Sequence, residues 1–341
     1  MANTIGNNIK VTVEGQSHSE FIDVLIEGLP AGLNIDMESI QAFLNRRQGG
    51  NSRYTTPRKE KDEPVIESGV VDGKTDGQML EAKFYNSNVR SGDYSNLRTV
   101  PRPSHADYVA YVKYEGKADM RGGGQFSGRL TLPICFVGAI CIDALKEQGI
   151  TIESKIVSVG TLKLYENGVK IPGAEEKMEE YLTAIAVDGD STGGVIECTV
   201  NGLPVGVGDP LYDSLESKLA HAIFGIPAVK GIEFGAGFGI TEMLGSVAND
   251  PFIIKDGKIT CGSNNSGGIQ GGISNGMPVV FRVAIKPTPS ISKPQRSVDI
   301  TTMEETELVI KGRHDSCIVP RALPGVEAMA AICLYDALLG D

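Results

Sequence analysis

The sequence lacks an excess of positive charge. It has 32 Lys and Arg residues against 43 Asp and Glu, which gives a formal net charge of −11. A protein that binds nucleic acid needs a basic face for the phosphates, so this balance argues against nucleic acid as a partner. A small anionic ligand is still compatible with the sequence, because such a ligand needs only a local cluster of cations.

Cysteine pairs at metal-binding spacing are also missing. The chain has six scattered cysteines and no CxxC motif. Three of them, Cys135, Cys141 and Cys333, fall in apolar helical runs, where a thiol behaves as a small hydrophobic side chain. We therefore expect a reduced, cytoplasmic protein without a metal centre.

Targeting and dinucleotide-binding segments are absent as well. The first ten residues, MANTIGNNIK, contain no hydrophobic signal region. The most apolar run, Leu130 to Ile142, is too short to span a bilayer and carries Pro133. The GAGFG run at 235–239 is too short for the GxGxxG motif of dinucleotide-binding domains. The sequence therefore predicts neither a membrane partner nor a separate dinucleotide domain.

Hydrophobic patterning predicts a chain of mixed α and β structure. The predicted strands lie at residues 9–13, 21–27, 65–71, 79–85 and 108–114, with a strand pair at 152–164. The predicted helices are one capped by Asp36 and others at 175–185, 215–224, 130–145 and 320–339. The last two are apolar almost all round and must be buried. We therefore expect an α+β fold in which a helical layer is sandwiched between antiparallel β-sheets.

Three short words of the first half recur in the second. The pairs are IEGLPAG (26–32) with VNGLPVG (200–206), TDGQMLEAKF (75–84) with SNGMPVVFRV (274–283), and AICIDAL (139–145) with AICLYDAL (331–338). The two members of each pair are separated by about 190 residues, which is a candidate repeat period. We predict a single domain, residues 1–341, that is internally duplicated with pseudo-two-fold symmetry. Its two sheet-plus-helix halves would span about 1–160 and 190–341, and chance matching of short words is the alternative.

The stretch from Arg102 to Thr131 concentrates residues that favour anion chemistry. His105 lies between an arginine and a carboxylate, and the triplet Gly122–Gly124 lets the backbone approach a ligand. Arg129 is expected in the first turn of the apolar helix that follows. A helix N-terminus with free N–H groups and a nearby cation is a good anion site. The alternative is a loop that merely ends a strand and caps a helix.

Other segments add candidate ligand-binding residues. Seven of the thirteen side chains at 51–63 are charged, which is typical of a solvated loop or of an arginine-rich lid carrying Arg47 and Arg53 to an anion. The glycine-rich segment 264–278 predicts a close approach of backbone to a flat or phosphorylated ligand. Asp315 follows Arg313 closely, either as a structural ion-pair partner or as part of a site.

Together these segments resemble the chorismate synthase family, in the family's order and over nearly the whole chain. The motifs that carry the resemblance are GQSHSE, RRQGGNSRYTTPRKEKDE, RPSHADY, RGGGQFSGR, AVKGIEFGAGF, NNSGGIQGGISNGMP, KPTPSI with the later Gln295, and GRHDSC. The resemblance implies a lyase of the shikimate pathway, in aromatic amino acid biosynthesis. Such an enzyme converts 5-enolpyruvylshikimate-3-phosphate to chorismate by 1,4-anti elimination of phosphate. It also implies reduced FMN as cofactor and a homotetramer.

The resemblance also implies roles for individual residues. His18 resembles the acid near the departing phosphate, and His105 resembles the histidine that donates a proton to reduced FMN. Asp315 resembles the aspartate near flavin N5 that relays the C6 proton. The arginines implied for the substrate's phosphate and carboxylates are Arg47, Arg53, Arg102, Arg129 and Arg313. The residues implied for FMN are Gln125, Phe126, Ser127, Pro227, Ala228, Gly271, Lys286, Pro287, Thr288, Pro289, Ser290 and Arg313.

Some positions depart from the family pattern. Gln16 and Ser19 replace the acid and the second glycine of the common GESHG motif. Gln125 stands where a flavin-contacting arginine often does, and Leu130 replaces a glutamate. These changes concern the contacts to the FMN phosphate and the local charge. His221 matches no family motif and is expected to be structural.

Two other functions stay open at this point. One is a non-catalytic relative that keeps the fold and binds flavin or phosphate. The other is a flavin reductase, since family members differ in whether they also reduce FMN with NADPH, which would then be a further partner. Retention of His18, His105 and Asp315 favours the lyase.

Overall fold

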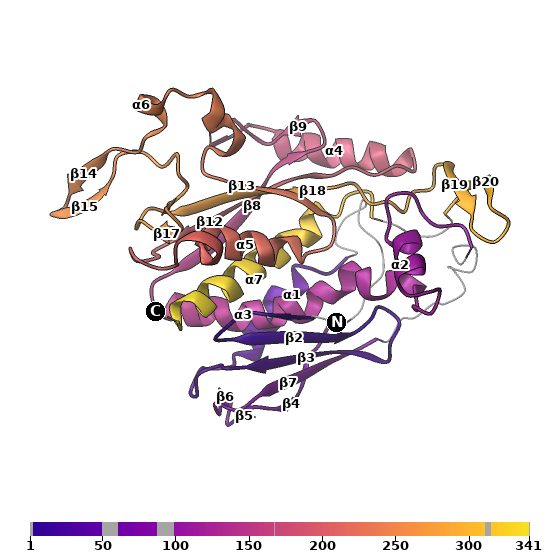
Figure 1. The fold of residues 1–341 in the computed structure, drawn as a ribbon, viewed down its shortest axis with the longest axis horizontal. Helices are drawn as coiled ribbons and strands as arrows, with labels where there is room; N and C mark the ends of the chain where they lie inside the picture. The colour runs from indigo at the N-terminus through magenta and orange to yellow at the C-terminus, as the bar shows by residue number, and fades with distance from the viewer. Residues whose placement is uncertain (1–2, 50–60, 87–98, 167, 311–314, 341) are drawn as a thin grey trace.

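Two antiparallel sheets enclose a layer of helices in the computed structural model, which describes residues 3–49, 61–86, 99–166, 168–310 and 315–340 (Figure 1). In spatial order, the strands of the first sheet are β1 (Thr4–Ile5), β2 (Lys10–Gly15), β3 (Phe21–Glu27), β7 (Leu80–Tyr85) and β4 (Val65–Ser68). Those of the second are β13 (Val229–Phe234), β18 (Val279–Ile285), β12 (Gly194–Asn201), β8 (Thr151–Val159) and β9 (Leu162–Lys163). The predicted sandwich is confirmed.

Two helices form the centre of the layer between the sheets. They are α3 (Thr131–Glu147) and α7 (Val319–Leu338), which pack side by side and are buried along most of their length. The stretch Gly128–Glu147 is long and apolar enough to cross a membrane, but 72% of its most apolar window is buried inside the molecule. Burial between two apolar sheet faces thus explains why both helices are apolar almost all round.

The two core helices approach most closely at Gly138. A Cβ atom at this position would lie 2.2 Å from the Cβ atom of Ala328 and 2.4 Å from its Cα atom. Both atoms belong to the α7 residue that faces Gly138, so no flexible side chain can move aside. The distance between α3 and α7 is therefore set by the absence of a side chain at this one residue.

We predict that Gly138→Ala lowers the free energy of unfolding by about 1–3 kcal/mol or more, because the added methyl group must push the helices apart. Denaturant unfolding at fixed protein concentration measures this change. Gly325→Ala, in α7, is the matched control, because a Cβ there meets its nearest neighbour at 4.0 Å. The control should be neutral or slightly stabilising, and an equal loss in both variants would contradict the packing argument.

The two sheets and their helices repeat one order of elements. In the first half β2, β3, α1 (Met37–Asn45), β4, β7 and α3 follow one another, and in the second β8, β12, α5 (Leu215–Phe224), β13, β18 and α7 do so. The strand orders β2-β3-β7-β4 and β8-β12-β18-β13 correspond, and α1 packs on α3 as α5 packs on α7. Strand β8 begins at Thr151 and pairs with β12, although the sequence division had placed it in the first half.

One predicted strand is a helix. Residues 108–114 were expected to be extended, but α2 spans Asp107–Lys113. Their tyrosine and valine side chains suggested a strand because such residues favour sheets, but that preference depends on burial against a neighbouring strand. Here no strand of the described chain pairs with the segment, and Tyr108, Val109 and Val112 are exposed on the helix surface.

The remaining elements lie outside the two sheets and the central layer. The helices are α4 (Ala174–Val187) and α6 (Gly245–Ala248). The hairpins are β5–β6 (Val70–Val71, Lys74–Thr75), β10–β11 (Tyr165–Glu166, Val169–Lys170), β14–β15 (Phe252–Lys255, Lys258–Cys261), β16–β17 (Ile269–Gln270, Ile273–Ser274) and β19–β20 (Gln295–Asp299, Glu304–Leu308). The β14–β15 hairpin extends away from the body of the molecule as an arm (Figure 1).

Candidate active site

A cavity of about 670 Å³ lies where the two core helices begin. Thr131 at the start of α3 and Ile318 just before α7 both line it, so the N-terminal ends of the two helices point to the same space. Free N–H groups and the helix dipoles make such a place favourable for negative charge. The volume lies in the range of small-molecule and cofactor sites.

His105 is held by a carboxylate and an arginine. Its Nδ1 atom lies 2.7 Å from Oδ1 of Asp107 and 3.1 Å from Nη2 of Arg102. The shorter contact is to an acceptor, so Nδ1 carries the proton and donates it to Asp107. The Nε2 atom then faces the cavity beside Gly123, where a Cβ would lie 3.6 Å from it. His105 therefore presents its Nε2 atom to the cavity.

Asp107 is the centre of this group. It accepts hydrogen bonds from the backbone N–H of Arg102 at 3.0 Å and from its Nε and Nη2 atoms at 2.7 and 2.8 Å. Burial alone would raise the pKa of the Asp107 carboxyl, but the hydrogen bonds and charges of Arg102 and His105 outweigh it and hold the pKa well below its usual range. Arg102 also donates to Oγ of Ser290 at 3.1 Å, which ties this group to the second half.

The glycine triplet packs directly against the turn that carries His18. Gly122, Gly123 and Gly124 all have positive φ angles, of 61°, 89° and 54°. A Cβ on Gly122 would lie 2.6 Å from Nε2 of His18 and 2.7 Å from Oγ of Ser17. Glycine is therefore required twice here, for the backbone conformation and for the space that the imidazole occupies.

Two further arginines meet at one buried aspartate. Arg47 donates through Nη1 to Oδ2 of Asp62 at 3.2 Å and through Nε to Oγ1 of Thr131 at 2.8 Å. Arg129 donates through Nη1 to Oδ1 of the same Asp62. Burial and the nearby charge of Arg321 lower the pKa of Arg47 to about 10, while Asp62 opposes the shift. Arg47 thus stays charged at neutral pH and lines the cavity as a fixed cation.

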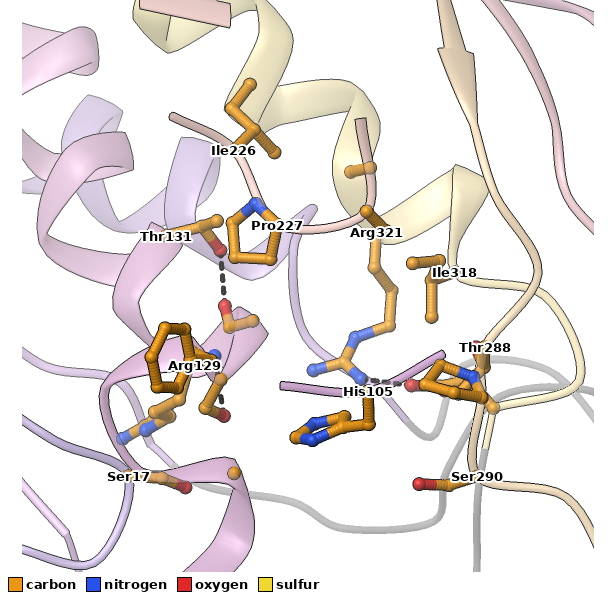
Figure 2. Close-up of a pocket in the computed structure, with 18 of the residues that line it drawn as sticks. Ser17, His105, Arg129, Thr131, Ile226, Pro227, Thr288, Ser290, Ile318 and Arg321 are labelled. Atoms are coloured by element: carbon orange, nitrogen blue, oxygen red, sulfur yellow. Dashed lines mark hydrogen bonds and ion pairs between the residues drawn. The ribbon is translucent and has the colours of Figure 1, made fainter. Parts of the chain in front are cut away.

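The second half supplies another aspartate and arginine. Asp315 accepts a hydrogen bond from Nη1 of Arg321 at 2.6 Å, and Nε of Arg321 donates to the backbone carbonyl of Arg47 at 3.1 Å. Figure 2 shows the Arg321 guanidinium and the His105 ring pointing into the same part of the cavity. Among the described residues, Asp315 forms an ion pair with Arg321, in the first turn of α7.

The cavity wall also fits the flavin that the sequence resemblance implies. Oγ1 of Thr288 is buried and has no hydrogen-bond partner among the described residues. Lys286 lines the cavity nearby, its Nζ 2.5 Å from the carbonyl of Ser104, and burial followed by the charge of Lys230 lowers its pKa. An orphan hydroxyl, a cation and a glycine cradle that a Cβ would fill are features of a site for a flat, phosphorylated group.

The structure brings most of the predicted site residues to this cavity. The predicted residues that line it are Arg47, Arg102, His105, Gln125, Phe126, Ser127, Arg129, Pro227, Ala228, Lys286, Thr288, Pro289, Ser290 and Asp315. His18 lies just behind the lining, next to Ser17, and Pro287 is not part of it. Arg53 and Arg313 lie outside the described residues. Arg129 lies in a short turn, Gly128–Leu130, just before α3 rather than in its first turn.

Gly271 is not brought to the cavity of this chain. It lies in the turn of the β16–β17 hairpin with open space around it. Several glycines of the 264–278 segment instead allow the chain to approach itself, since a Cβ on Gly267 would meet the backbone nitrogen of Gly235 at 2.4 Å and one on Gly272 the carbonyl of Asp209 at 2.3 Å. Gly271 therefore does not line this cavity, and the approach of the 264–278 backbone to a ligand stays a prediction.

Among the cavity residues that the sequence did not single out are Ser17, Asp62 and Arg321. Asp62 is one of seven charged residues in the segment 51–63, and nothing in the sequence separates it from the other six. For Arg321 a signal existed, because it follows Arg129 by 192 residues, the separation of the repeated helix words at Ala139 and Ala331.

The cavity brings arginines, His105 and two aspartates together at the starts of two helices, an arrangement typical of an enzyme site for an anionic ligand. The sequence profile of the chorismate synthase family matches residues 9–339, and the chain belongs to that family. It is 45% identical to the chorismate synthase of Dehalococcoides mccartyi, over 99% of this chain and 97% of that protein. It is 44% identical to that of Thermococcus kodakarensis, over 98% and 97%. A crystal structure of chorismate synthase superposes with a TM-score of 0.77 at 29% identity, covering 98% of this chain and 93% of the other.

Proposed function

We propose that this chain is a chorismate synthase that converts 5-enolpyruvylshikimate-3-phosphate to chorismate with reduced FMN. The observation that carries the proposal is the cavity in which Arg47, Arg129 and Arg321 surround His105 and Asp315 at the beginnings of two helices. The substrate carries two carboxylates and a phosphate, and guanidinium groups bind such anions through paired N–H donors. Although the chain has a net charge of −11, five cationic side chains line this cavity, namely Arg47, Arg102, Arg129, Lys286 and Arg321.

The proposed roles of the residues follow from their positions. His105 exchanges a proton at Nε2, because Nδ1 is engaged with Asp107. His18, buried against the glycine triplet, serves as the acid for the departing phosphate. Arg47, Arg102 and Arg129 hold the anionic groups, together with Arg53 and Arg313. Asp315 accepts the proton that the elimination removes.

Reduced FMN, when bound, supplies transient electron donation to the substrate. The residues that would hold it are Gln125 to Ser127, Pro227, Ala228 and Lys286 to Ser290. Thr288 would donate a hydrogen bond to the flavin through its Oγ1 hydroxyl, and Lys286 would place a positive charge next to the FMN phosphate. Gln125 lines the cavity but lacks the charge of arginine, so it would contact the flavin through an uncharged amide donor.

The direct test is phosphate release and chorismate formation under anaerobic conditions. Dithionite-reduced FMN should support turnover, and oxidised FMN alone should support none. Oxidised FMN with NADPH shows whether the chain also reduces its own flavin, which is the second candidate activity. Equal product with reduced and oxidised FMN would overturn the proposal. A protein that binds FMN but forms no chorismate would be the non-catalytic relative.

We also propose that the protein is a cytoplasmic homotetramer, in which the β14–β15 arm contacts a second copy. The two strands pair with each other alone, and Phe252, Ile254 and Ile259 are exposed by 70, 73 and 71%. An isolated two-stranded hairpin is marginally stable in water. Apolar side chains gathered on such an arm are typical of a surface that is covered on assembly.

Ile254→Asp should weaken assembly, because it places a charge where the proposed contact is apolar. Light scattering of the wild-type protein should give the mass of a tetramer, and the variant should shift toward smaller species at the same concentration. Glu242→Gln, on an exposed residue near the base of the arm, is the control and should leave the mass unchanged. A wild-type monomer, or a variant that keeps the tetramer mass, would contradict the assignment.

A further inference from the structure

Arg321 belongs to none of the residues for which the family resemblance implies a role, yet it lines the cavity. Its guanidinium makes two hydrogen bonds in different directions. Nη1 donates to Oδ2 of Asp315 at 2.6 Å, and Nε donates to the backbone carbonyl of Arg47 at 3.1 Å. The side chain of Asp315 is 10% exposed and that of Arg321 is 26% exposed, so the pair is shielded from bulk water on most sides.

Arg321 occupies the place in the second half that Arg129 occupies in the first. Each lies at the start of one core helix, and each donates through Nη1 to an aspartate that lines the cavity, Asp62 for Arg129 and Asp315 for Arg321. The two arginines are separated by 192 residues, as are Ala139 and Ala331 within the repeated helix words. The pairing of a helix-start arginine with a cavity aspartate is therefore present twice, although the aspartates come from different places in the fold, Asp62 before β4 and Asp315 before α7.

The two bonds of Arg321 connect groups with different tasks. Arg47 belongs to the segment after α1 and is one of the proposed anion ligands, whereas Asp315 precedes α7 and is the proposed proton acceptor. A guanidinium is planar, so fixing Nε against the Arg47 carbonyl also fixes the direction in which Nη1 points. Arg321 thereby fixes the position of the Asp315 carboxylate relative to Arg47, on the anion-binding side of the cavity.

We propose that Arg321 is a positioning residue for the reaction, which acts by holding Asp315 in place relative to the ligand bound at Arg47. This inference rests on the proposed function. A carboxylate that must meet a proton on a bound substrate loses much of its effect when it is displaced by about 1 Å. Loss of Arg321 should therefore lower the rate of the chemical step more than it weakens binding.

The test is a double-mutant cycle with Arg321→Gln, Asp315→Asn and the double variant. Steady-state rates at saturating substrate, KM, and FMN affinity by equilibrium titration are measured for each. Arg321→Gln should lower kcat roughly 10- to 100-fold, with KM and FMN affinity within about threefold. The double variant should be no slower than Asp315→Asn alone, because Arg321 acts through Asp315. Arg321→Lys, which keeps the charge but not the fork, should recover only part of kcat.

Arg46→Gln is the matched control. Arg46 also reaches α7, where it donates to Glu327 at 2.7 and 2.9 Å, but it does not line the cavity. Its loss should lower thermal stability and leave kcat unchanged. Multiplicative losses in the double variant, or a large rise in KM with kcat retained, would overturn the positioning role and leave the proposed function standing. So would an Arg321→Gln variant that loses only stability. A wild-type protein that forms no chorismate would overturn both.

Discussion

Replacing Asp315 with asparagine should lower the rate of chorismate formation roughly 10²–10⁴-fold, the usual contribution of a positioned general base. Asparagine keeps the size of the side chain and can still accept a hydrogen bond from Arg321, but it cannot take up a proton as a carboxylate does. Affinities for FMN and substrate should change by less than about tenfold, since no cation has been removed. Rates at saturating substrate and an equilibrium FMN titration measure the two effects separately.

The competing role for Asp315 gives the opposite pattern. If the carboxylate serves only as the ion-pair partner of Arg321, the variant should lose binding or thermal stability and keep its rate at saturation. Asp119→Asn is a useful comparison, because Asp119 also pairs with an arginine, Arg121, at 2.6 Å but on the surface. That variant should retain nearly the wild-type rate.

Replacing Asp107 with asparagine should lower the free energy of unfolding by about 3–5 kcal/mol at pH 7, as expected when one partner of a buried ion pair is removed. The carboxylate is only 6% exposed and accepts from three nitrogens of Arg102 as well as from His105. The amide would leave the Arg102 guanidinium without its counter-charge. It would also remove the anionic acceptor that fixes the His105 tautomer, so activity should fall as well.

The stability difference should depend on pH in a defined direction. The pKa of Asp107 is lowered in the folded protein from its ordinary value of 3.8. Its contribution is therefore present in full above that ordinary value and is lost as the pH falls through the lower, folded-state value. When denaturant unfolding is followed from pH 7 downward, the difference between wild type and variant should stay constant to about pH 4 and narrow as the pH falls further. A difference that does not narrow below about pH 4 would show that the loss comes from packing and not from the charge.

The sequence predicted the sandwich because its determinants are local and repeated. The runs 130–145 and 320–339 contain almost no polar face, so burial on all sides was the one arrangement open to them. The strand at 21–27 and the helix at 215–224 were predicted with the bounds that the structure shows. The error at 108–114 came from side chains that favour sheets but had no neighbouring strand to pack against.

The site was predictable where its partners are close in the chain. Arg102, His105 and Asp107 lie within six residues, so their mutual hydrogen bonds could be anticipated from the segment alone. Asp62 and Arg321 could not be placed in this way. Asp62 lies 67 residues from Arg129, and Arg321 lies 274 residues from the Arg47 carbonyl that it binds, so these contacts exist only after the two halves have packed together.

Helices α3 and α7 both begin at the same cavity, and this has an evolutionary consequence. If the two halves arose by gene duplication and fusion, the unfused ancestor would have been a homodimer with this cavity on its symmetry axis, and each copy would have contributed one arginine at a helix start. The proposed substrate is not symmetrical, so the two equivalent arginines could not keep identical tasks after fusion. Their divergence is visible now, because Arg129 shares Asp62 with Arg47, whereas Arg321 pairs with Asp315.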